Sequence, residues 1–205
     1  MPSFEYEFSF APQCVAGVDE VGRGPWAGPV VAASVIVLNK TLFLEEFAGI
    51  DDSKKISKKM REIFFNRLKI VNFIKFNVGI ASVEEIDSLN ILNATFLAMN
   101  RALEGMKADI VIVDGNKAIS GAKIKTIPII KGDSKSYSIA AASIIAKVSR
   151  DNIMTDLARN FPEYKWNENS GYGTKAHRHA ILEYGICCHH RKSYAPIKNK
   201  YFACS

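Results

Sequence analysis

The sequence contains no long uninterrupted apolar run, and no segment approaches the roughly 18 consecutive apolar residues that a membrane-spanning helix requires. Its first residues, MPSFEYEFSFAPQ, also lack the basic stretch and following apolar run of a secretory signal. We therefore expect a soluble, cytoplasmic protein that has no membrane partner.

Cysteine is scarce, with four residues in a chain of 205 and no CxxC spacing among them. Cys187 and Cys188 are sequence neighbours, and neighbouring cysteines rarely form a disulfide with each other. This usage favours a reducing compartment. The run from Cys187 to His190 also raises the alternative of a zinc site, but tetrahedral zinc sites normally take their ligands from two separated pairs. We therefore interpret this run as a surface or packing segment.

The chain has no internal repeat, no low-complexity tract and no linker rich in proline, glycine or serine. Its 205 residues, 48% of them hydrophobic, are enough for one well-buried core and few for two. We expect a single domain over residues 1–205, with a core at about 14–160 and a helical C-terminal region at about 161–205, acting as a monomer.

Basic residues outnumber acidic ones by 27 to 21, which gives a net charge of +6. A positive net charge suits a polyanionic partner such as nucleic acid. Charge alone decides little, because many proteins that bind no nucleic acid are equally basic.

Hydrophobic patterning predicts five strands. The first three are joined by short or modest connections and indicate an antiparallel start. The fourth is a short, continuous apolar run typical of a strand buried on both faces, and Pro128 pushes the fifth toward a sheet edge. The predicted strands lie at 14–18, 30–38, 73–81, 109–113 and 123–130.

Helix signals fall between and after these strands. A helix begins near Ser57, and a long helix begins with the capping-box spacing of Ser82 and Glu85 and ends at Gly105. Further helices are predicted from about Ser134 to Arg159 and near Lys175 to Tyr184, before an irregular basic tail. Met60, Ile63, Phe64 and Leu68 mark the apolar face of the first helix, and Ile86, Leu89, Leu92, Phe96, Leu97 and Leu103 that of the second. Strands followed by helix–strand alternation predict a mixed sheet covered by helices, of the α/β or α+β class.

Four carboxylates fall at the ends of predicted strands. Asp19 and Glu20 end the first strand, Asp114 ends the fourth, and Asp133 follows the fifth where a helix begins. If the first and fourth strands are parallel neighbours, Asp19 and Asp114 meet at one sheet edge, and Asp133 can join them. Each residue could instead be an ordinary turn or cap residue, since aspartate is common in both places.

A cluster of these carboxylates would repel itself unless a cation were present. Oxygen ligands favour Mg²⁺ or Mn²⁺ over zinc, which prefers cysteine and histidine. Two such ions can activate a water molecule and stabilise the leaving oxygen of a phosphodiester. The placement of the four residues therefore predicts a metal site.

Seven segments, in one consistent order, resemble motifs of the ribonuclease HII family. They are VAGVDEVGRGPWAGPVVAA (15–33), DDSKKIS (51–57), EIDSLNILNATFLAMNRAL (85–103), VDGNK (113–117), KGDSKSYSIAAASIIAKVSRD (131–151), SGYGTKAH (170–177) and HRKSYAP (190–196). A match over nearly the whole chain is far more specific than a single glycine-rich turn.

The resemblance implies a ribonuclease H-like fold: a mixed five-stranded sheet flanked by helices, with a helical C-terminal extension. It implies an endonuclease that cuts the RNA strand of RNA/DNA hybrids and the 5′ side of ribonucleotides embedded in duplex DNA, leaving 5′-phosphate and 3′-hydroxyl ends. It also implies two divalent ions, Mn²⁺ or Mg²⁺. The catalytic and metal-binding residues would be Asp19, Glu20, Asp114 and Asp133.

The resemblance further implies two elements that contact the ribose. Gly22, Arg23 and Gly24 match a loop whose backbone approaches the 2′-hydroxyl, where a Cβ would block close contact. Tyr172 matches a tyrosine that packs on the ribose and hydrogen-bonds the same hydroxyl, a partner that deoxyribose lacks. From the residues alone, a tight turn with a solvated Arg23 and simple loop packing of Tyr172 are the favoured interpretations.

Phosphate contacts are implied for Ser53, Lys54 and Lys55, and less strongly for Arg191 and Ser193. A solvated basic lead-in to a helix remains the alternative for Lys55 and the lysines after it. The sequence departs from the family pattern at Trp26, at Asp51 and at Ser170, which takes the place of the usual lysine. These departures concern substrate affinity and loop geometry and leave the carboxylates intact.

Three alternatives remain open at this point. One is a ribonuclease HIII-type enzyme, which typically carries GKG in place of GRG and an additional N-terminal domain. Another is a basic nucleic-acid-binding module without catalysis. The third is a zinc hydrolase, disfavoured because residues two apart on a helix, as His177 and His179 would be, do not face the same way. Its possible ligands would be His177, His179, His189 and His190.

Overall fold

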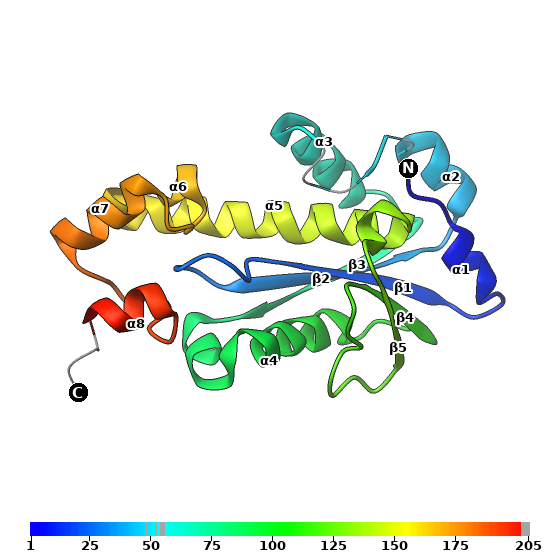
Figure 1. Cartoon of the computed structure of the whole chain (residues 1–205). Coiled ribbons are helices and arrows are strands. Elements are labelled where there is room, and N and C mark those ends of the chain that lie inside the picture. The colour runs from blue at the N-terminus through cyan, green and yellow to red at the C-terminus, as the bar shows by residue number, and fades with distance from the viewer. Residues whose placement is uncertain (48, 52, 54–55, 202–205) are drawn as a thin grey trace.

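A computed structural model describes residues 1–47, 49–51, 53 and 56–201 of the chain. A five-stranded sheet forms the middle layer, with the long helix α5 (Tyr137–Asn160) on one face and α4 (Val83–Leu103) on the other (Figure 1). Apolar clusters fill both interfaces between helix and sheet. The predicted class, a mixed sheet covered by helices, is confirmed.

The strands follow the order β3-β2-β1-β4-β5. Antiparallel pairs join β1 (Val15–Val21) to β2 (Val30–Val37) and β2 to β3 (Ile74–Ala81). Parallel pairs join β1 to β4 (Ile110–Asp114) and β4 to β5 (Lys125–Ile129). The antiparallel start and the edge position of the strand that contains Pro128 are therefore confirmed. The parallel pairing of the first and fourth strands, on which the predicted metal site depends, is confirmed as well.

Helix α3 (Lys58–Leu68) begins after Ser57, whose hydroxyl accepts a hydrogen bond from the Met60 amide. Phe64 and Leu68 are buried as predicted. Met60 and Ile63, however, are 40% and 41% exposed, so the predicted apolar face is too wide. The helix buries only a narrow stripe because it packs mainly against α5, on the side away from the sheet (Figure 1).

The capping box predicted for α4 is present, with Ser82 and Glu85 bonded to each other's backbone amides. The sequence did not reveal the kink at Asn90, where φ is 65° and the backbone leaves the helix. The Asn90 side chain accepts hydrogen bonds from the amides of Leu92 and Asn93 and so caps the second half of the helix. Leu89, just before this kink, is 40% exposed and lies off the predicted apolar side.

Helix α5 begins three residues later than predicted. A short 3₁₀ turn, η1 (Gly132–Ser134), comes first, and Ser136 then caps the helix by accepting from the Ile139 amide. Its small side chains, among them Ala140, Ala141 and Ala142, are buried and let the helix approach the sheet closely. A Cβ on Gly17 of β1 would lie 2.4 Å from the Ser138 carbonyl carbon, so only glycine permits this contact.

The C-terminal helices lie together at one end of the molecule (Figure 1). α7 (Lys175–Tyr184) matches its predicted bounds, whereas α6 (Trp166–Asn169), the turn η2 (Pro162–Tyr164) and α8 (Ala195–Tyr201) were not predicted. They share a small apolar cluster with the end of α5. The sequence pattern also missed α1 (Glu5–Ser9) and α2 (Lys40–Phe47) near the start of the chain. The division at about residue 160 stays a prediction.

Among the described residues, none of the helices combines the length and the apolar content needed to cross a membrane.

Candidate active site

The sheet brings Asp19 and Asp114 to one edge. The parallel register of β1 and β4 ends with Val18 opposite Val113, so the two aspartates follow at adjacent positions. Successive residues of a strand point to opposite faces. Gly17 and Asp19 therefore share the face that carries α5, and Asp114 points to the same side as Ile112, which packs against Ile139 of α5.

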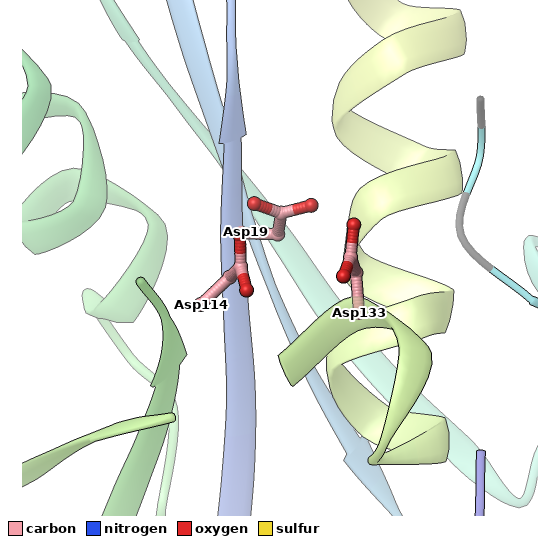
Figure 2. A group of neighbouring side chains, drawn as sticks. All are labelled: Asp19, Asp114 and Asp133. Carbon is pink, nitrogen blue, oxygen red and sulfur yellow. The ribbon is translucent and has the colours of Figure 1, made fainter. Parts of the chain in front are cut away.

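Asp133 completes the group from the turn η1. The close approach of α5 to Gly17 carries this turn toward the sheet. Carboxylate oxygens of Asp19, Asp114 and Asp133 all lie within 4.8 Å of one another, and Figure 2 shows the three side chains converging from β1, β4 and the turn. The three residues, far apart in sequence, meet as predicted.

The N-terminal segment braces the backbone around this turn. The buried Glu7 of α1 accepts hydrogen bonds from the hydroxyls of Ser136 (2.7 Å) and Ser138 (2.6 Å) through one carboxylate oxygen. The Ser3 amide donates to the Lys135 carbonyl, and Ser3 in turn accepts from Tyr137. Helix α1 thus fixes the start of α5, immediately after Asp133. No sequence pattern indicates this role.

The aspartate group carries unfavourable charge. Asp19 and Asp133 are each only 6% exposed. The pKa of Asp19 is raised well above its usual value, first by burial and then by the charges of Glu20 and Asp114. Hydrogen bonds from the Glu20 amide to Asp19 and from the Gly132 amide to Asp114 offset part of this cost. A buried set of oxygen ligands that repel one another fits a hard divalent cation.

Glu20, which the sequence also predicted as a ligand, is not one of the three residues whose oxygens lie within 4.8 Å of one another, although its charge acts on Asp19. Its position, one residue after Asp19 on the same strand, turns it to the α4 side of the sheet. There it lines a cavity of about 230 Å³ together with Asp114, Phe96 and Lys117. Burial raises the pKa of Glu20, and an ion pair with Arg23 at 3.1 Å opposes the rise. Glu20 therefore reaches the group only from its flank.

Ser53 connects the 51–57 segment to the carboxylates. It is 5% exposed, and its hydroxyl lies 2.8 Å from that of Ser143 on α5. Ser143 also hydrogen-bonds Asp19 and thereby lowers the pKa of that carboxyl. Ser143 was not predicted, because a serine within an alanine-rich helix reads as simple packing. Lys54 and Lys55 fall outside the described residues.

Two buried arginines hold the loop that contains Gly22, Arg23 and Gly24. Arg191 donates to the carbonyls of Gly22 (2.6 Å), Arg23 (3.1 Å) and Gly28 (2.8 Å). Arg150 donates to the carbonyls of Pro29, Ala27 and Ser170. Burial and the neighbouring Arg191 charge lower the pKa of Arg150 to about 10.

The phosphate contact predicted for Arg191 is therefore corrected. Its side chain is fully buried, and its nitrogens are occupied by backbone carbonyls and the Tyr194 hydroxyl. Arg191 therefore supports the Gly22–Gly28 loop from the protein interior. Ser193 is exposed, but its amide and hydroxyl both donate to Asp87 of α4, an acceptor that the sequence did not reveal.

Tyr172 lies beside this loop, as the two predicted ribose contacts require. A methyl group on Gly24 would come within 3.4 Å of the Tyr172 ring, which is itself partly exposed. The Trp26 amide donates to the Gly171 carbonyl, and the Trp26 ring fills the space beside Gly173. Trp26, one of the departures from the family pattern, thus packs the two loops together.

The Cys187–His190 run is a packing segment, as predicted. His190 is fully buried, the Cys187 amide donates to its ring, and His189 packs edge-on against Phe161. Within the part of the chain that the structure describes, the three aspartates form the only group of three or more potential metal ligands. The zinc alternatives have no support there.

The buried His190 predicts a pH-dependent stability. Burial, and secondarily the charge of His177, lower the pKa of His190 to about 4. Between about pH 6.5 and pH 4 the unfolded chain therefore binds a proton at His190 and the folded protein does not. The stability present above about pH 6.5 should fall as the pH drops toward 4, by up to about 3 kcal/mol. Urea unfolding should show the wild type losing more stability than His190→Asn between pH 7 and pH 5, with the exposed His179→Gln as control. Equal losses would show that His190 titrates normally.

Solved structures share this fold. The ribonuclease HII of Archaeoglobus fulgidus, solved in complex with PCNA, superposes with a TM-score of 0.75 and 26% identity, covering 88% of this chain and 95% of that one. The ribonuclease H2 of Pyrococcus horikoshii gives 0.71 and 27%, covering 91% and 96%. The fold and the carboxylate group define a ribonuclease H-type hydrolase.

Sequence comparison gives the family. The model of the ribonuclease HII family matches residues 16–197. Ribonuclease HII of the Wolbachia endosymbiont of Brugia malayi is 52% identical over 187 residues, 90% of this chain and 89% of that protein. The chain belongs to the ribonuclease HII family, a family of divalent-metal enzymes that act on nucleic acid. The HIII-type and non-catalytic alternatives are set aside.

Proposed function

We propose that this chain hydrolyses the RNA strand of RNA/DNA hybrids and incises duplex DNA on the 5′ side of embedded ribonucleotides, leaving 5′-phosphate and 3′-hydroxyl ends. One observation carries the proposal: three carboxylates, two of them buried and the third half-buried, converge next to a glycine loop and an exposed tyrosine. A phosphodiester cleaved beside a ribose needs these two parts together, one for hydrolysis and one for recognition.

Asp19, Asp114 and Asp133 would hold Mn²⁺ or Mg²⁺, and Glu20 would complete the set from the α4 side. When bound, two divalent ions supply charge neutralisation at phosphorus and activation of the attacking water. The chain contributes a fixed, water-poor arrangement of the carboxylates. The backbone amides of Glu20 and Gly132 orient Asp19 and Asp114, and the Ser143 hydroxyl holds Asp19 from α5.

Ribose recognition is assigned to the loop Gly22–Gly24 and to Tyr172. The loop is held rigid from the protein interior, because the carbonyls of Gly22 and Arg23 accept hydrogen bonds from Arg191. The Tyr172 hydroxyl can then distinguish a 2′-hydroxyl from hydrogen. Arg23 would exchange its ion pair with Glu20 for substrate phosphate when Glu20 engages a cation.

The remaining contacts follow the duplex backbone. Lys54, Lys55 and Ser193 are proposed to lie along its phosphates, whereas the buried Ser53 supports its segment from within through Ser143. Such contacts position a substrate without reading its bases, which suits an enzyme indifferent to sequence. We further propose that the protein acts as a monomer in the cytoplasm.

Asp114→Asn tests the function directly. Removing one charge from the group should abolish Mg²⁺- or Mn²⁺-dependent cleavage of a duplex with a single ribonucleotide, a loss of at least about 10²–10³-fold. Hybrid binding should be largely retained, because Asp114 contributes no positive charge toward phosphate. Cleavage products are mapped at nucleotide resolution, and an all-DNA duplex should stay intact. Surviving cleavage in the variant would show that the site lies elsewhere.

A further inference from the structure

The proposed ribose contact of Tyr172 depends on where the Tyr172 backbone lies, because its exposed side chain does not hold the residue in place. The ring is 48% exposed. The residues before it, Ser170 and Gly171, have φ values of 49° and 82°, in the left-handed region. The Tyr172 amide donates to Asn169, and its carbonyl accepts from the amide of Thr174 (2.8 Å) and from His177 Nδ1 (2.9 Å). Of these hydrogen bonds, the one to His177 is made by a side chain that is fully buried.

The hydrogen-bond network assigns the tautomers of the two buried histidines. A carbonyl can only accept, so His177 Nδ1 carries the proton and its Nε2 holds a lone pair. The indole nitrogen of Trp166, which can only donate, lies 3.1 Å from this Nε2. His190 Nε2 also lies 3.1 Å away and must donate, so it shares the single lone pair of His177 Nε2 with the indole, and His190 Nδ1 accepts from the Cys187 amide at 3.0 Å. Both rings are neutral and every ring nitrogen has a partner.

The hydrogen-bond network of Trp166, His177 and His190 is rigid because it is shielded from solvent and closely packed. Trp166, His177 and His190 are each 0% exposed. Tyr164 stacks on Trp166 with ring centroids 5.0 Å apart and meets His190 edge-on at 4.7 Å. The position of His177 is therefore set by three neighbouring side chains, those of Trp166, His190 and Tyr164.

We infer that His177 is a positioning residue that determines ribose specificity: through its Nδ1–H it fixes the Tyr172 carbonyl and so holds the phenol beside Gly24. The inference rests on the proposed function, in which Tyr172 contacts the 2′-hydroxyl. His190 and Trp166 act one step further back by holding the His177 ring. None of the three touches the substrate.

Two substitutions at the same position separate the hydrogen bond from the packing. His177→Asn keeps an N–H close to the place of Nδ1, whereas His177→Gln moves its amide toward Nε2 and leaves the Tyr172 carbonyl without that donor. The measurement is discrimination: the ratio of dissociation constants for an all-DNA duplex and for the same duplex with one ribonucleotide. All proteins carry Asp114→Asn so that the duplex is not cut.

His177→Gln should lose about tenfold in this ratio, the effect expected when one hydrogen bond no longer holds its partner. His177→Asn should lose little, and His179→Gln, an exposed change two residues along α7, should lose nothing. In a Tyr172→Ala background, His177→Gln should have no further effect. The inference would be overturned if His177→Asn and His177→Gln reduced the ratio equally. It would also be overturned if His177→Gln reduced the ratio as much in the Tyr172→Ala background as with Tyr172 present.

Thermal unfolding of each variant checks that the fold persists. His190→Leu tests the network from its far end: it removes a donor to His177 while leaving the bond to Tyr172, so it should reduce discrimination by a smaller factor. Unchanged discrimination in both His177→Gln and His190→Leu would likewise overturn the proposal. The proposed function fails separately, if the wild-type protein does not cleave the same duplex.

Discussion

Asp19→Asn is expected to abolish metal-dependent cleavage and, at the same time, to stabilise the metal-free protein. Asp19 stands at the centre of the carboxylate group and is almost completely buried. Burial and the neighbouring carboxylates raise its pKa, so the folded state resists ionisation of Asp19 more than the unfolded chain does. Asparagine keeps the shape of the side chain and removes the charge.

The sign of the stability effect follows from the direction of this shift. A group whose pKa is higher in the folded state favours folding below its unfolded pKa, and that advantage is lost as the pH rises through the folded pKa. At neutral pH Asp19 therefore costs stability. The variant should gain about 0.5–2 kcal/mol in the free energy of unfolding, as is common when a strained functional group is replaced.

Urea unfolding with a chelator present measures the gain, and cleavage of the single-ribonucleotide duplex measures the loss, which should reach at least about 10²–10³-fold. Asp156→Asn is a matched control, because Asp156 is an exposed aspartate paired with Arg159 and remote from the group. A variant that is destabilised at pH 7, or one that still cleaves, would contradict the electrostatic account of the site.

Arg191→Met is expected to have the largest effect on stability. The substitution keeps much of the aliphatic volume but removes donors from three loop carbonyls, those of Gly22, Arg23 and Gly28. The Arg23 carbonyl keeps the Tyr194 hydroxyl as a donor, whereas the Gly22 and Gly28 carbonyls lose theirs. Buried carbonyls left without partners cost about 1–3 kcal/mol each, and the loop can relax only in part, so a total of about 3–5 kcal/mol is expected. Cleavage should fall in addition, because the loop beside Tyr172 loses its support.

Lys192→Ala provides the control. The Lys192 side chain is exposed, and the hydrogen bond to Asp87 comes from the backbone amide, which alanine keeps. Arg191→Lys should recover only part of the lost stability, because an ammonium group cannot span three separate carbonyls as a planar guanidinium does. A destabilisation below about 1 kcal/mol in Arg191→Met would show that water or a rearranged loop satisfies these carbonyls.

Much of the fold could be predicted because local and tertiary preferences agree. The strand β4 is a continuous apolar run, and Ser57 and Ser82 cap their helices as the sequence indicates. The errors occur where tertiary contacts decide. Asn90 breaks α4 although its neighbours favour a helix, and α1 is held by Glu7 bonding to serines more than 120 residues away, which no local pattern encodes.

The candidate site divides in the same way. Asp19 and Asp114 could be placed from strand ends and a parallel register, which are properties of sequence order. The separate position of Glu20 also follows from strand alternation and could have been predicted. The structural roles of Arg150, Arg191 and Ser143 could not, because an arginine in a basic tail and a serine in a helix carry no sign that they are buried.

The support of the Gly22–Gly28 loop by Arg191 has a consequence for the order in which the protein matures. During synthesis, a chain that has emerged through α5 already contains all three aspartates of the cluster. The loop beside them still lacks the guanidinium of Arg191, which organises its carbonyls and follows Asp151 of α5 by some 40 residues. A nascent chain would thus hold the hydrolytic group before it could tell ribose from deoxyribose, and that ability would be added last.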